Sequence, residues 1–341
     1  MIREKVKNLW KLCFNDSEEF TELYFRLRYN NDINIAIQSG DLVIAALQML
    51  PYPMTYCGKT IATSYVSGAC THPDFRNKGV MRELLAESFG KMHQKGILLS
   101  TLIPAEPWLF DYYAQSGYTT AFHYQTTIFH QTADYELSSE YAMTVTNELT
   151  AASYDYFEQR MHQRPCCIQH TAADLKVILA DLQLSGGHIY TLYHTLQQEP
   201  VALAFAYPAK EGEWWIGELL ANSEQEAQNL LQRICQTTQQ DTLRLLHPVQ
   251  EKEKRERLGM ARIIDAHAML QLYAAAYPET EWNLVLPDEQ LQANTGYYYL
   301  NNGHCMKSAK RLPVSHLALT IGELTAKILV PQHPYMSLML N

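Results

Sequence analysis

The chain has 341 residues, of which 47% are hydrophobic, and its formal net charge is −9. This length is too great for one ordinary core, so two or three domains are expected. The acidic balance argues against a general nucleic-acid-binding role, and no apolar run approaches the roughly 20 residues that cross a bilayer. Seven cysteines without a disulfide framework and an amphipathic N-terminus without a signal region predict a cytoplasmic protein that does not bind membranes.

Up to about residue 130, the pattern of apolar residues and turn residues predicts a mixed α/β unit. The Tyr52-Pro53 pair is expected to end a strand, and Cys57-Gly58-Lys59 is typical of a hairpin turn. In chain order, we expect two helices within 2–29, strands over 34–37, 42–50 and 61–71, a helix whose apolar face runs from Val80 to Met92, a strand over 97–103, a short helix over 108–116 and a strand over 118–130.

The junction between the strand over 61–71 and the helix that follows it carries the strongest functional signal. Arg76, Asn77, Lys78 and Gly79 lie where the helix begins, so the first backbone N–H groups have no partners within the helix. These groups carry the positive end of the helix dipole and have two cationic side chains beside them, which favours a pyrophosphate. Gly79 has no Cβ, so a ligand can approach its backbone closely. The alternative is a plain connection whose charged residues lie in a solvated turn.

A second unit is expected over residues 131–250. Its elements are helices over 154–164 and 172–183, strands over 188–196, 201–207 and 213–220, a helix over 223–237 and a strand over 242–246. This order repeats that of the first unit, so we interpret the segment as a degenerate copy. Its last helix begins with Glu224 and Glu226, which would repel a pyrophosphate, and we predict that this unit binds no coenzyme.

A third unit is expected over residues 251–341. The run Glu251–Gly259 mixes acidic and basic residues, which favours a boundary over a nucleic-acid patch. Beyond it we expect a strand over 260–264, a helix over 266–277, strands over 282–287, 293–300 and 305–309, and apolar segments over 314–321 and 325–328. The apolar tail from Pro334 to Asn341 contains no charged side chain, so docking is favoured over fraying.

The pattern Arg-x-x-Gly after a strand resembles the coenzyme A loop of the GNAT N-acetyltransferases, with Arg76, Gly79 and Met81 at the three signature positions. The longer string THPDFRNKGVM is similar to one branch, the multidomain acetyltransferases like the enhanced-intracellular-survival (Eis) protein. In that branch the third position is usually apolar and larger. Residues 261–265 and 294–298 resemble the sterol-carrier-like C-terminal domain of the same branch. The resemblance covers essentially the whole chain, with specific motifs in the first unit and loose ones elsewhere.

This resemblance implies an α/β (α+β) fold with a mixed central sheet, flanking helices, a second degenerate GNAT-like domain and a sterol-carrier-like α+β domain. Residues 1–130 would form the catalytic domain and bind acetyl-CoA. The backbone of the strand that precedes the loop is placed to hydrogen-bond the pantetheine arm and to polarise the acetyl carbonyl. The residues that we expect to contact the coenzyme are Val66, Ser67, Gly68, Arg76, Asn77, Lys78, Gly79, Val80 and Met81.

Acetyl transfer by direct attack needs an acid for the departing thiolate and a base for the amine. Tyr113 matches the tyrosine of the family's acid-bearing segment, and a phenol with a pKa near 10 is a suitable donor. Tyr112 and Tyr118 are interpreted as core aromatics. In the Eis branch the C-terminal carboxylate enters the active site, so the carboxylate of Asn341 is the candidate for orienting or deprotonating the amine. The alternative is a tail that only packs.

We expect no metal cofactor, because the adjacent cysteines near His162 and His170 are poor metal ligands. His72 and Asp74 suit a turn that caps the next helix and are not assigned a catalytic role. The leading interpretation is an acetyl-CoA-dependent N-acetyltransferase for a primary amine of a small or peptidic acceptor. The alternatives are a protein that binds an apolar ligand, such as a lipid, through its C-terminal domain, and a coenzyme-A-sensing regulator without catalysis. The identity of the acceptor and the oligomeric state, including a homo-oligomer, stay open.

Overall fold

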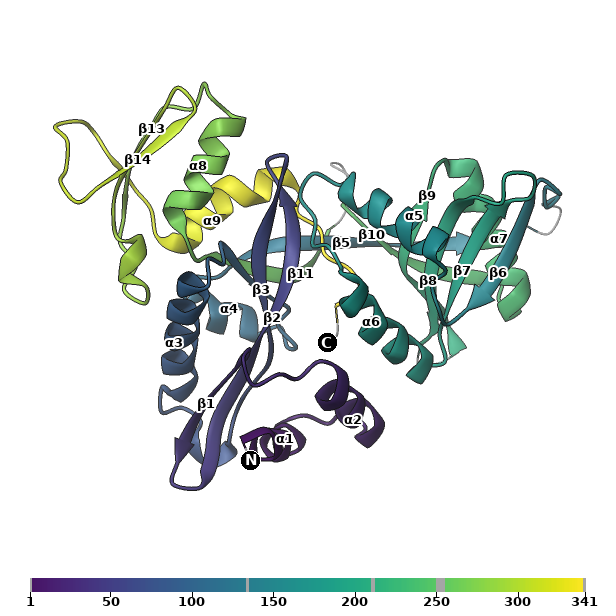
Figure 1. The fold of residues 1–341 in the computed structure, drawn as a ribbon, viewed down its shortest axis with the longest axis horizontal. Helices are drawn as coiled ribbons and strands as arrows, with labels where there is room; N and C mark the ends of the chain where they lie inside the picture. Colours follow the sequence, from purple (N-terminus) through teal and green to yellow (C-terminus); the bar gives the residue numbers. More distant parts are fainter. Residues whose placement is uncertain (1, 133–134, 210–211, 250–254, 340–341) are drawn as a thin grey trace.

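The structure is a computed structural model that describes residues 2–132, 135–209, 212–249 and 255–339 (Figure 1). Within these residues, the strands form a mixed sheet of 11 strands and a separate sheet of 4 strands, with helices packed against them. The expected mixed α/β class is therefore confirmed. No helix in the described ranges is both long enough and apolar enough to cross a membrane.

The first unit follows the expected order closely. Its elements are α1 (Ile2–Cys13), α2 (Glu18–Leu27), β1 (Asn34–Ser39), β2 (Leu42–Tyr56), β3 (Lys59–Thr71), a short 3-10 turn (Pro73–Phe75), α3 (Val80–Gln94), β4 (Leu99–Leu102), α4 (Leu109–Ala114) and β5 (Thr119–His130). Helix α3 buries Met81, Leu84, Leu85, Phe89 and Met92 against the sheet, as the 3.6-residue spacing predicts. Val80, which was expected on the same face, is only partly buried.

Strand β2 differs from the expectation, because it continues through Pro51 and Pro53 instead of ending at residue 52. Strand β1 pairs only with the first half of β2, up to Gln48, and β3 pairs with Ala45–Tyr56 of β2. Past Gln48 the outer edge of β2 has no partner among the named strands. It meets only the segment 166–169, through the Pro53 carbonyl and the Thr55 N–H, so the missing N–H groups of the prolines remove no ladder bond there. The Tyr52-Pro53 breaker signal was wrong for this reason.

The second unit contains β6 (Tyr141–Thr146), α5 (Ala151–His162), α6 (Ala172–Leu184), β7 (His188–His194), β8 (Pro200–Pro208), β9 (Trp214–Ala221), α7 (Glu224–Thr238) and β10 (Thr242–His247). Strand β6 was not expected from the sequence. It lies at the outer edge of the large sheet and none of its residues is buried, so it lacks the alternation of buried residues that marks a strand. Threonine side chains cap both α5 and α6, and Thr171 and Asp174 form a capping box.

The third unit contains β11 (Glu256–Ile263), α8 (Ala266–Ala276), β12 (Trp282–Leu286), a 3-10 turn (Gln292–Asn294), β13 (Gly296–Asn301), β14 (His304–Ser308), β15 (Leu317–Ala318), α9 (Ile321–Leu329) and a final 3-10 turn (Val330–Gln332). Helix α9 occupies residues that the sequence marked only as apolar segments. Its start signal was present, because Thr320 and Glu323 form a capping box. Part of the charged run expected at the boundary, residues 256–259, belongs to β11, and residues 251–254 lie outside the described ranges.

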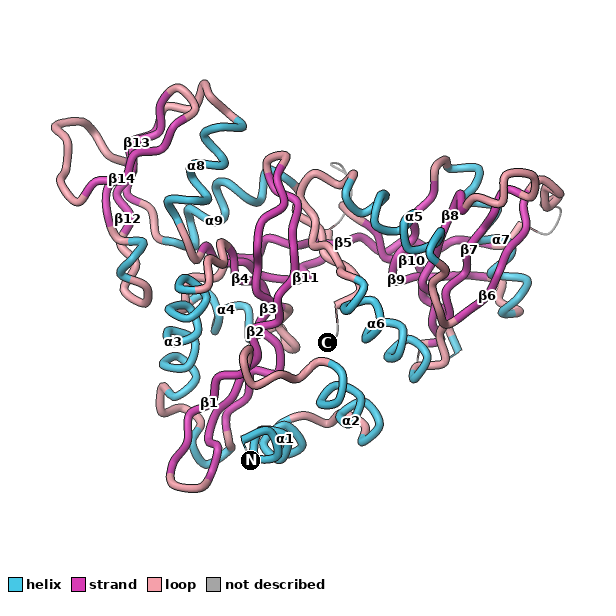
Figure 2. The backbone as a smooth tube through the Cα atoms, in the orientation of Figure 1, coloured by secondary structure: helices cyan, strands magenta, loops and turns pink. Residues whose placement is uncertain are grey.

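Strand β11 lies in the large sheet between β4 and β5, although about 120 positions separate it from β5 in the sequence. Its residues 260–263 pair with β4, and residues 256–261 pair with the first half of β5. The second half of β5 pairs with β10 of the second unit. The strand order is β1-β2-β3-β4-β11-β5-β10-β9-β8-β7-β6. The first and second units therefore share one sheet, with β11 of the third unit inserted, and Figure 2 shows this sheet as a continuous band of strands.

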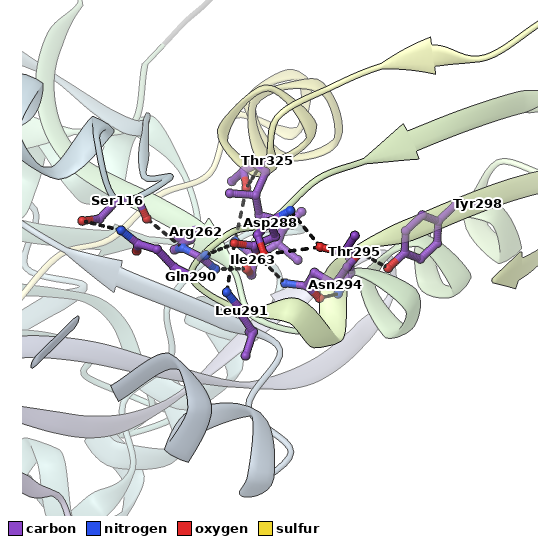
Figure 3. A network of polar contacts seen from close by, with 12 residues as sticks. Ser116, Arg262, Ile263, Asp288, Gln290, Leu291, Asn294, Thr295, Tyr298 and Thr325 are labelled. Atoms are coloured by element: carbon purple, nitrogen blue, oxygen red, sulfur yellow. Dashed lines mark hydrogen bonds and ion pairs between the residues drawn. The ribbon is translucent and has the colours of Figure 1, made fainter. Parts of the chain in front are cut away.

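A buried network around Arg262 fastens the third unit to the first (Figure 3). Arg262 on β11 is only 1% exposed, and its guanidinium donates to the carboxylate of Asp288 over 2.7 Å and to the carbonyl of Ser116 over 2.8 Å. The same guanidinium stacks over Phe89 of α3 at 4.1 Å. Asn294 donates to the other oxygen of Asp288. This network holds the turn after α4, so it fixes the segment that carries Tyr113.

Candidate active site

The amino end of α3 presents its first backbone N–H groups without a competing side chain. Gly79 is the N-cap residue, and no side chain caps the helix. Gly79 has a φ of +78°, and Asn77 has a φ of +60°, so the loop makes two left-handed turns just before the helix. A Cβ at Gly79 would meet no atom within 4 Å, which leaves open space at this helix end. The arrangement suits an anion.

Two cationic side chains flank this helix end, as the sequence predicts. Arg76 and Lys78 are both exposed. Arg76 donates through Nε to the carbonyl of Thr71 at 3.2 Å, which leaves its terminal nitrogens for another partner. Lys78 donates to the carbonyl of Asp74 at 2.8 Å and lies over the Phe75 ring at 5.1 Å. Both cations are thus tethered by their own loop.

His72 and Asp74 have a structural role that differs from the predicted one, because they shape a 3-10 turn before α3 and do not cap α3 itself. The Nδ1 atom of His72 accepts from the backbone N–H of Asp74, and His72 is the N-cap residue of the 3-10 turn over Pro73–Phe75. The two side chains approach to 3.8 Å. This cap shapes the loop that presents Arg76 and Lys78.

The charge of Arg76 also acts on a cysteine of α1. The pKa of the Cys13 thiol is lowered to about 7, first by its hydrogen bond to Cys70 and then by Arg76. Cys70 is buried on β3, and its pKa is raised by the same hydrogen bond to Cys13 and by burial. Both thiols are free. The base of the loop therefore carries a polar contact between α1, β3 and the Arg76 side chain.

The strand that leads into the loop has an open edge. Strand β3 pairs with β4 only from Thr63 to Tyr65, whereas β3 continues to Thr71. From Val66 onward, that edge of β3 has no strand partner among the described residues. Its backbone groups are therefore available to hydrogen-bond an extended ligand.

Gly68 serves a purpose that the sequence did not indicate. It lies in a β-bulge with a φ of +59°, opposite Leu47 of β2, where two residues of β3 face one residue of β2. A Cβ at Gly68 would overlap the ring of Trp10 from α1. The absence of a side chain at Gly68 therefore makes room for the ring of Trp10. Next to it, the Ser67 hydroxyl accepts from Tyr24 over 2.9 Å. The role of this backbone toward a ligand stays a prediction.

Tyr113 lies on α4 in the same buried cluster as Val66 of β3 and Met81 of α3. It is 8% exposed, and its hydroxyl has no hydrogen-bond partner among the described residues. Burial raises the pKa of its phenol, with smaller contributions from Tyr118 and Tyr112. The phenol therefore keeps its proton at neutral pH. Tyr118 is fully buried and bonded to Ser100, which fits its interpretation as a core residue.

The corresponding helix of the second unit, α7, ends differently at its amino terminus. Its N-cap residue is Ser223, whose hydroxyl accepts from the backbone N–H of Glu226 at 3.2 Å. Ser223 also donates to the Glu226 carboxylate at 2.7 Å. A capped and acidic helix end supports the prediction that this unit binds no coenzyme.

The C-terminal tail is docked between the first two units. The segment 166–169 hydrogen-bonds on one side to Pro53 and Thr55 of β2, at 2.8 and 2.9 Å. On its other side, Tyr335 exchanges backbone hydrogen bonds with Cys166 and Ile168, at 2.9 and 3.0 Å. The tail therefore extends a small ladder that begins on β2, and the yellow chain in Figure 1 runs along this path.

Side chains of the second unit then hold Ser337. Glu218 is 1% exposed and accepts from the Ser337 hydroxyl at 2.6 Å, while Arg164 pairs with both oxygens of Glu218 at 2.8 Å. His170 donates from Nε2 to the Ser337 carbonyl at 2.9 Å, and burial lowers the pKa of its imidazole. Sequence reasoning did not find these tail contacts, because nothing links residues so far apart in the chain. Asn341 lies outside the described residues.

Residues 3–121 match the family model described as an acetyltransferase (GNAT) domain. The first unit is therefore similar to a GNAT acetyltransferase domain over these residues. This match confirms the expectation of an acyltransferase at the level of the domain family. The matched range spans the open edge of β3, the loop before α3 and Tyr113. No curated protein matches the sequence.

Solved structures share the fold over nearly the whole chain. A GCN5-related N-acetyltransferase from Anabaena variabilis has a TM-score of 0.77 at 15% identity and covers 98% of this chain and 96% of its own. A GCN5-related N-acetyltransferase from Kribbella flavida has a TM-score of 0.76 at 17% identity, over 99% of this chain and 95% of its own. Eis1 from Mycobacterium abscessus has a TM-score of 0.73 at 11% identity, over 96% of this chain and 86% of its own. At these identities the similarity concerns the fold.

Proposed function

We propose that the protein is an acetyl-CoA-dependent N-acetyltransferase that transfers the acetyl group to a primary amine of a small or peptidic acceptor. The observation that carries this proposal is the uncapped amino end of α3, with Arg76 and Lys78 beside it, next to the unpaired edge of β3. A binding assay for coenzyme A by calorimetry, followed by a thiol-release assay with a panel of amines, tests the proposal.

In this proposal the loop and the strand divide the work of holding the coenzyme. The N–H groups of Gly79, Val80 and Met81 bind the pyrophosphate, with Asn77 shaping the loop and the two cations completing the charge. The backbone of Val66, Ser67 and Gly68 binds the pantetheine arm along the open edge and polarises the acetyl carbonyl. This positioning supplies most of the rate, because it holds the thioester and the amine in line.

Removing the Arg76 charge is expected to weaken coenzyme binding. The Arg76→Ala variant should bind coenzyme A about 5- to 20-fold more weakly, because one charge-assisted hydrogen bond to phosphate is lost. Calorimetry measures this affinity. The matched control is Lys59→Ala, which removes an equal charge at the opposite end of β3 and should leave the affinity unchanged. Equal affinities for the two variants would contradict the phosphate role of Arg76.

The reaction is a direct displacement. The amine nitrogen forms a bond to the acetyl carbon, the carbon–sulfur bond breaks, and the sulfur leaves as a thiolate. Tyr113 donates its phenolic proton to that sulfur, which gives the free thiol of coenzyme A. The nitrogen loses one proton to a base, so the products are an amide and coenzyme A.

We assign the base or orienting role to the C-terminal carboxylate of Asn341. The support is the docked tail, which is held through Tyr335 and Ser337 close to the first unit. Adding a short polar extension after Asn341 should reduce turnover at least 100-fold, because it displaces the carboxylate. Coenzyme affinity should stay unchanged in the same protein. Full activity of the extended chain in the thiol-release assay would remove this role.

The finer family assignment is also part of the proposal. The whole-chain likeness to Eis1 supports the multidomain Eis-like branch. In that assignment residues 1–130 are catalytic, residues 131–250 are a degenerate GNAT-like domain, and residues 251–341 are a sterol-carrier-like domain. The last of these packs against the catalytic unit through Arg262, which supports a scaffolding role.

A further inference from the structure

A cavity of about 320 Å³ lies between the first two units and crosses the large sheet. Its wall runs over six neighbouring strands, from β4 to β8, through Ile103, Leu258, Tyr124, Leu246, Gly217 and Tyr207. Because adjacent strands lie about 4.8 Å apart, five such steps give a length on the order of 20 Å. The small volume and this length together describe a narrow trough. Helix α6 and the C-terminal tail form its other walls.

One end of the trough reaches the open edge of β3. Ile103 directly follows β4, and its backbone hydrogen-bonds to the hydroxyl of Tyr65. Tyr65 is the last residue of β3 that pairs with β4, and Val66 follows it. This end of the trough therefore meets the point where the two strands separate. In the proposed function, the pantetheine arm lies along that same edge.

The other end of the trough contains one carboxylate without a partner. Asp181 lies on α6, and its side chain forms no hydrogen bond or ion pair with any described residue. Burial alone raises the pKa of its carboxyl, and its charge adds to the raised pKa of Tyr207 beside it. Glu218 on β9, a buried acid of the same unit, is by contrast paired with Arg164. A carboxylate in partly apolar surroundings favours a cation that neutralises it.

The walls between the two ends are mainly aromatic and aliphatic. Phe205, Trp215, Tyr335 and Met336 contribute to them, together with the strand residues named above. Apolar walls of this kind bury a hydrocarbon chain or a flat ring. The trough therefore has an apolar body with one anionic end, and the other end lies at the proposed reaction point.

We propose that the trough binds the acceptor, and that the acceptor is an elongated amine with an apolar body and a second cationic group at its far end. The reacting amine lies at the Ile103 end, and the second cation pairs with Asp181. This inference rests on the proposed acetyl transfer and adds the class of acceptor. Asp181 is a specificity-determining residue, because it acts on the end of the acceptor that does not react.

A length series of amines tests this assignment. Diaminobutane, diaminooctane and diaminodecane are compared with butylamine, octylamine and decylamine in the thiol-release assay. We expect kcat/KM for the longest diamine to exceed that for its matched monoamine by about 10- to 100-fold. For diaminobutane and butylamine, the ratio of the two kcat/KM values should fall to about twofold, because diaminobutane cannot span the trough. A factor of two is the statistical advantage of having two equivalent amines.

The variant Asp181→Asn keeps the shape of the side chain and removes its charge. It should lower kcat/KM for the long diamine by about 10- to 100-fold and leave the value for decylamine within about twofold. Asp155→Asn, an exposed position on α5, removes the same charge away from the trough and should change neither value.

The outcomes separate the two proposals. Coenzyme A binding that is undetectable by calorimetry overturns the proposed function itself. If the coenzyme binds and any amine is acetylated, the acceptor assignment is overturned when long diamines show no advantage, or when the advantage survives in Asp181→Asn. The same holds if the coenzyme binds and the amines of the series are not acetylated. A preference that is lost in Asp181→Asn and kept in Asp155→Asn supports the assignment.

Discussion

Replacing Asp288 by alanine is expected to lower the free energy of unfolding by about 3–5 kcal/mol. The change leaves the guanidinium of Arg262 buried at 1% exposure without its counter-charge, between β11 and the turn after α4. It also removes the acceptor for Asn294 and for the backbone N–H of Leu291. Urea denaturation followed by circular dichroism measures this difference.

The neighbouring residue supplies the control for this prediction. Glu289 is exposed, and Glu289→Ala should change the free energy of unfolding by less than about 0.5 kcal/mol. The double variant Arg262→Met with Asp288→Leu should regain much of the loss, because it removes the uncompensated charge. Equal free energies of unfolding for Asp288→Ala and Glu289→Ala would show that the pair of Arg262 and Asp288 does not stabilise the protein.

Replacing Tyr113 by phenylalanine is expected to lower kcat by about 10²- to 10⁴-fold. The change removes the hydroxyl that we propose as the proton donor to the departing sulfur and keeps the ring in its cluster with Val66 and Met81. The hydroxyl has no hydrogen bond to a described residue, so its removal should cost little stability. Coenzyme affinity should remain within about twofold of the wild-type value. Thiol release under saturating acetyl-CoA measures kcat, and calorimetry measures the affinity.

Tyr112 offers a matched control, because it precedes Tyr113 on the same helix and is only half-buried. Tyr112→Phe should keep kcat within about threefold of the wild-type value, since a hydroxyl away from the reacting sulfur takes no part in proton transfer. If Tyr113→Phe and Tyr112→Phe behave alike, Tyr113 is a core aromatic residue and another group protonates the sulfur.

Local patterns allowed the loop and its helix to be predicted from the sequence. The spacing of Met81, Leu84 and Phe89 marks the buried face of α3, and a glycine at its start leaves the helix uncapped. These features depend on neighbours within about one or two helical turns. The same holds for α9, whose capping box at Thr320 and Glu323 was present in the sequence and was overlooked.

Features that depend on distant partners could not be predicted in this way. The prolines of β2 looked like breakers, because the sequence does not show that β1 stops pairing with β2 at Gln48, before Pro51 and Pro53. The sequence around residue 256 does not show that β11 pairs with β4. Likewise, the sequence around Ser337 does not show that its hydroxyl donates to Glu218. In the sequence, Asp181 does not differ from other polar residues of its helix, and only the packing of α6 against β8 and β9 places it in the trough. Tertiary contacts decide all four cases.

The position of β11 has a consequence for the order in which the chain can fold during synthesis. The ribosome releases β4 and β5 long before residues 256–263, so the nascent first unit has two unpaired strand edges until β11 is made. Residues 131–250 emerge and fold in that interval. A fragment that stops at residue 130 therefore lacks a central strand of its own sheet, and it should aggregate when it is expressed alone.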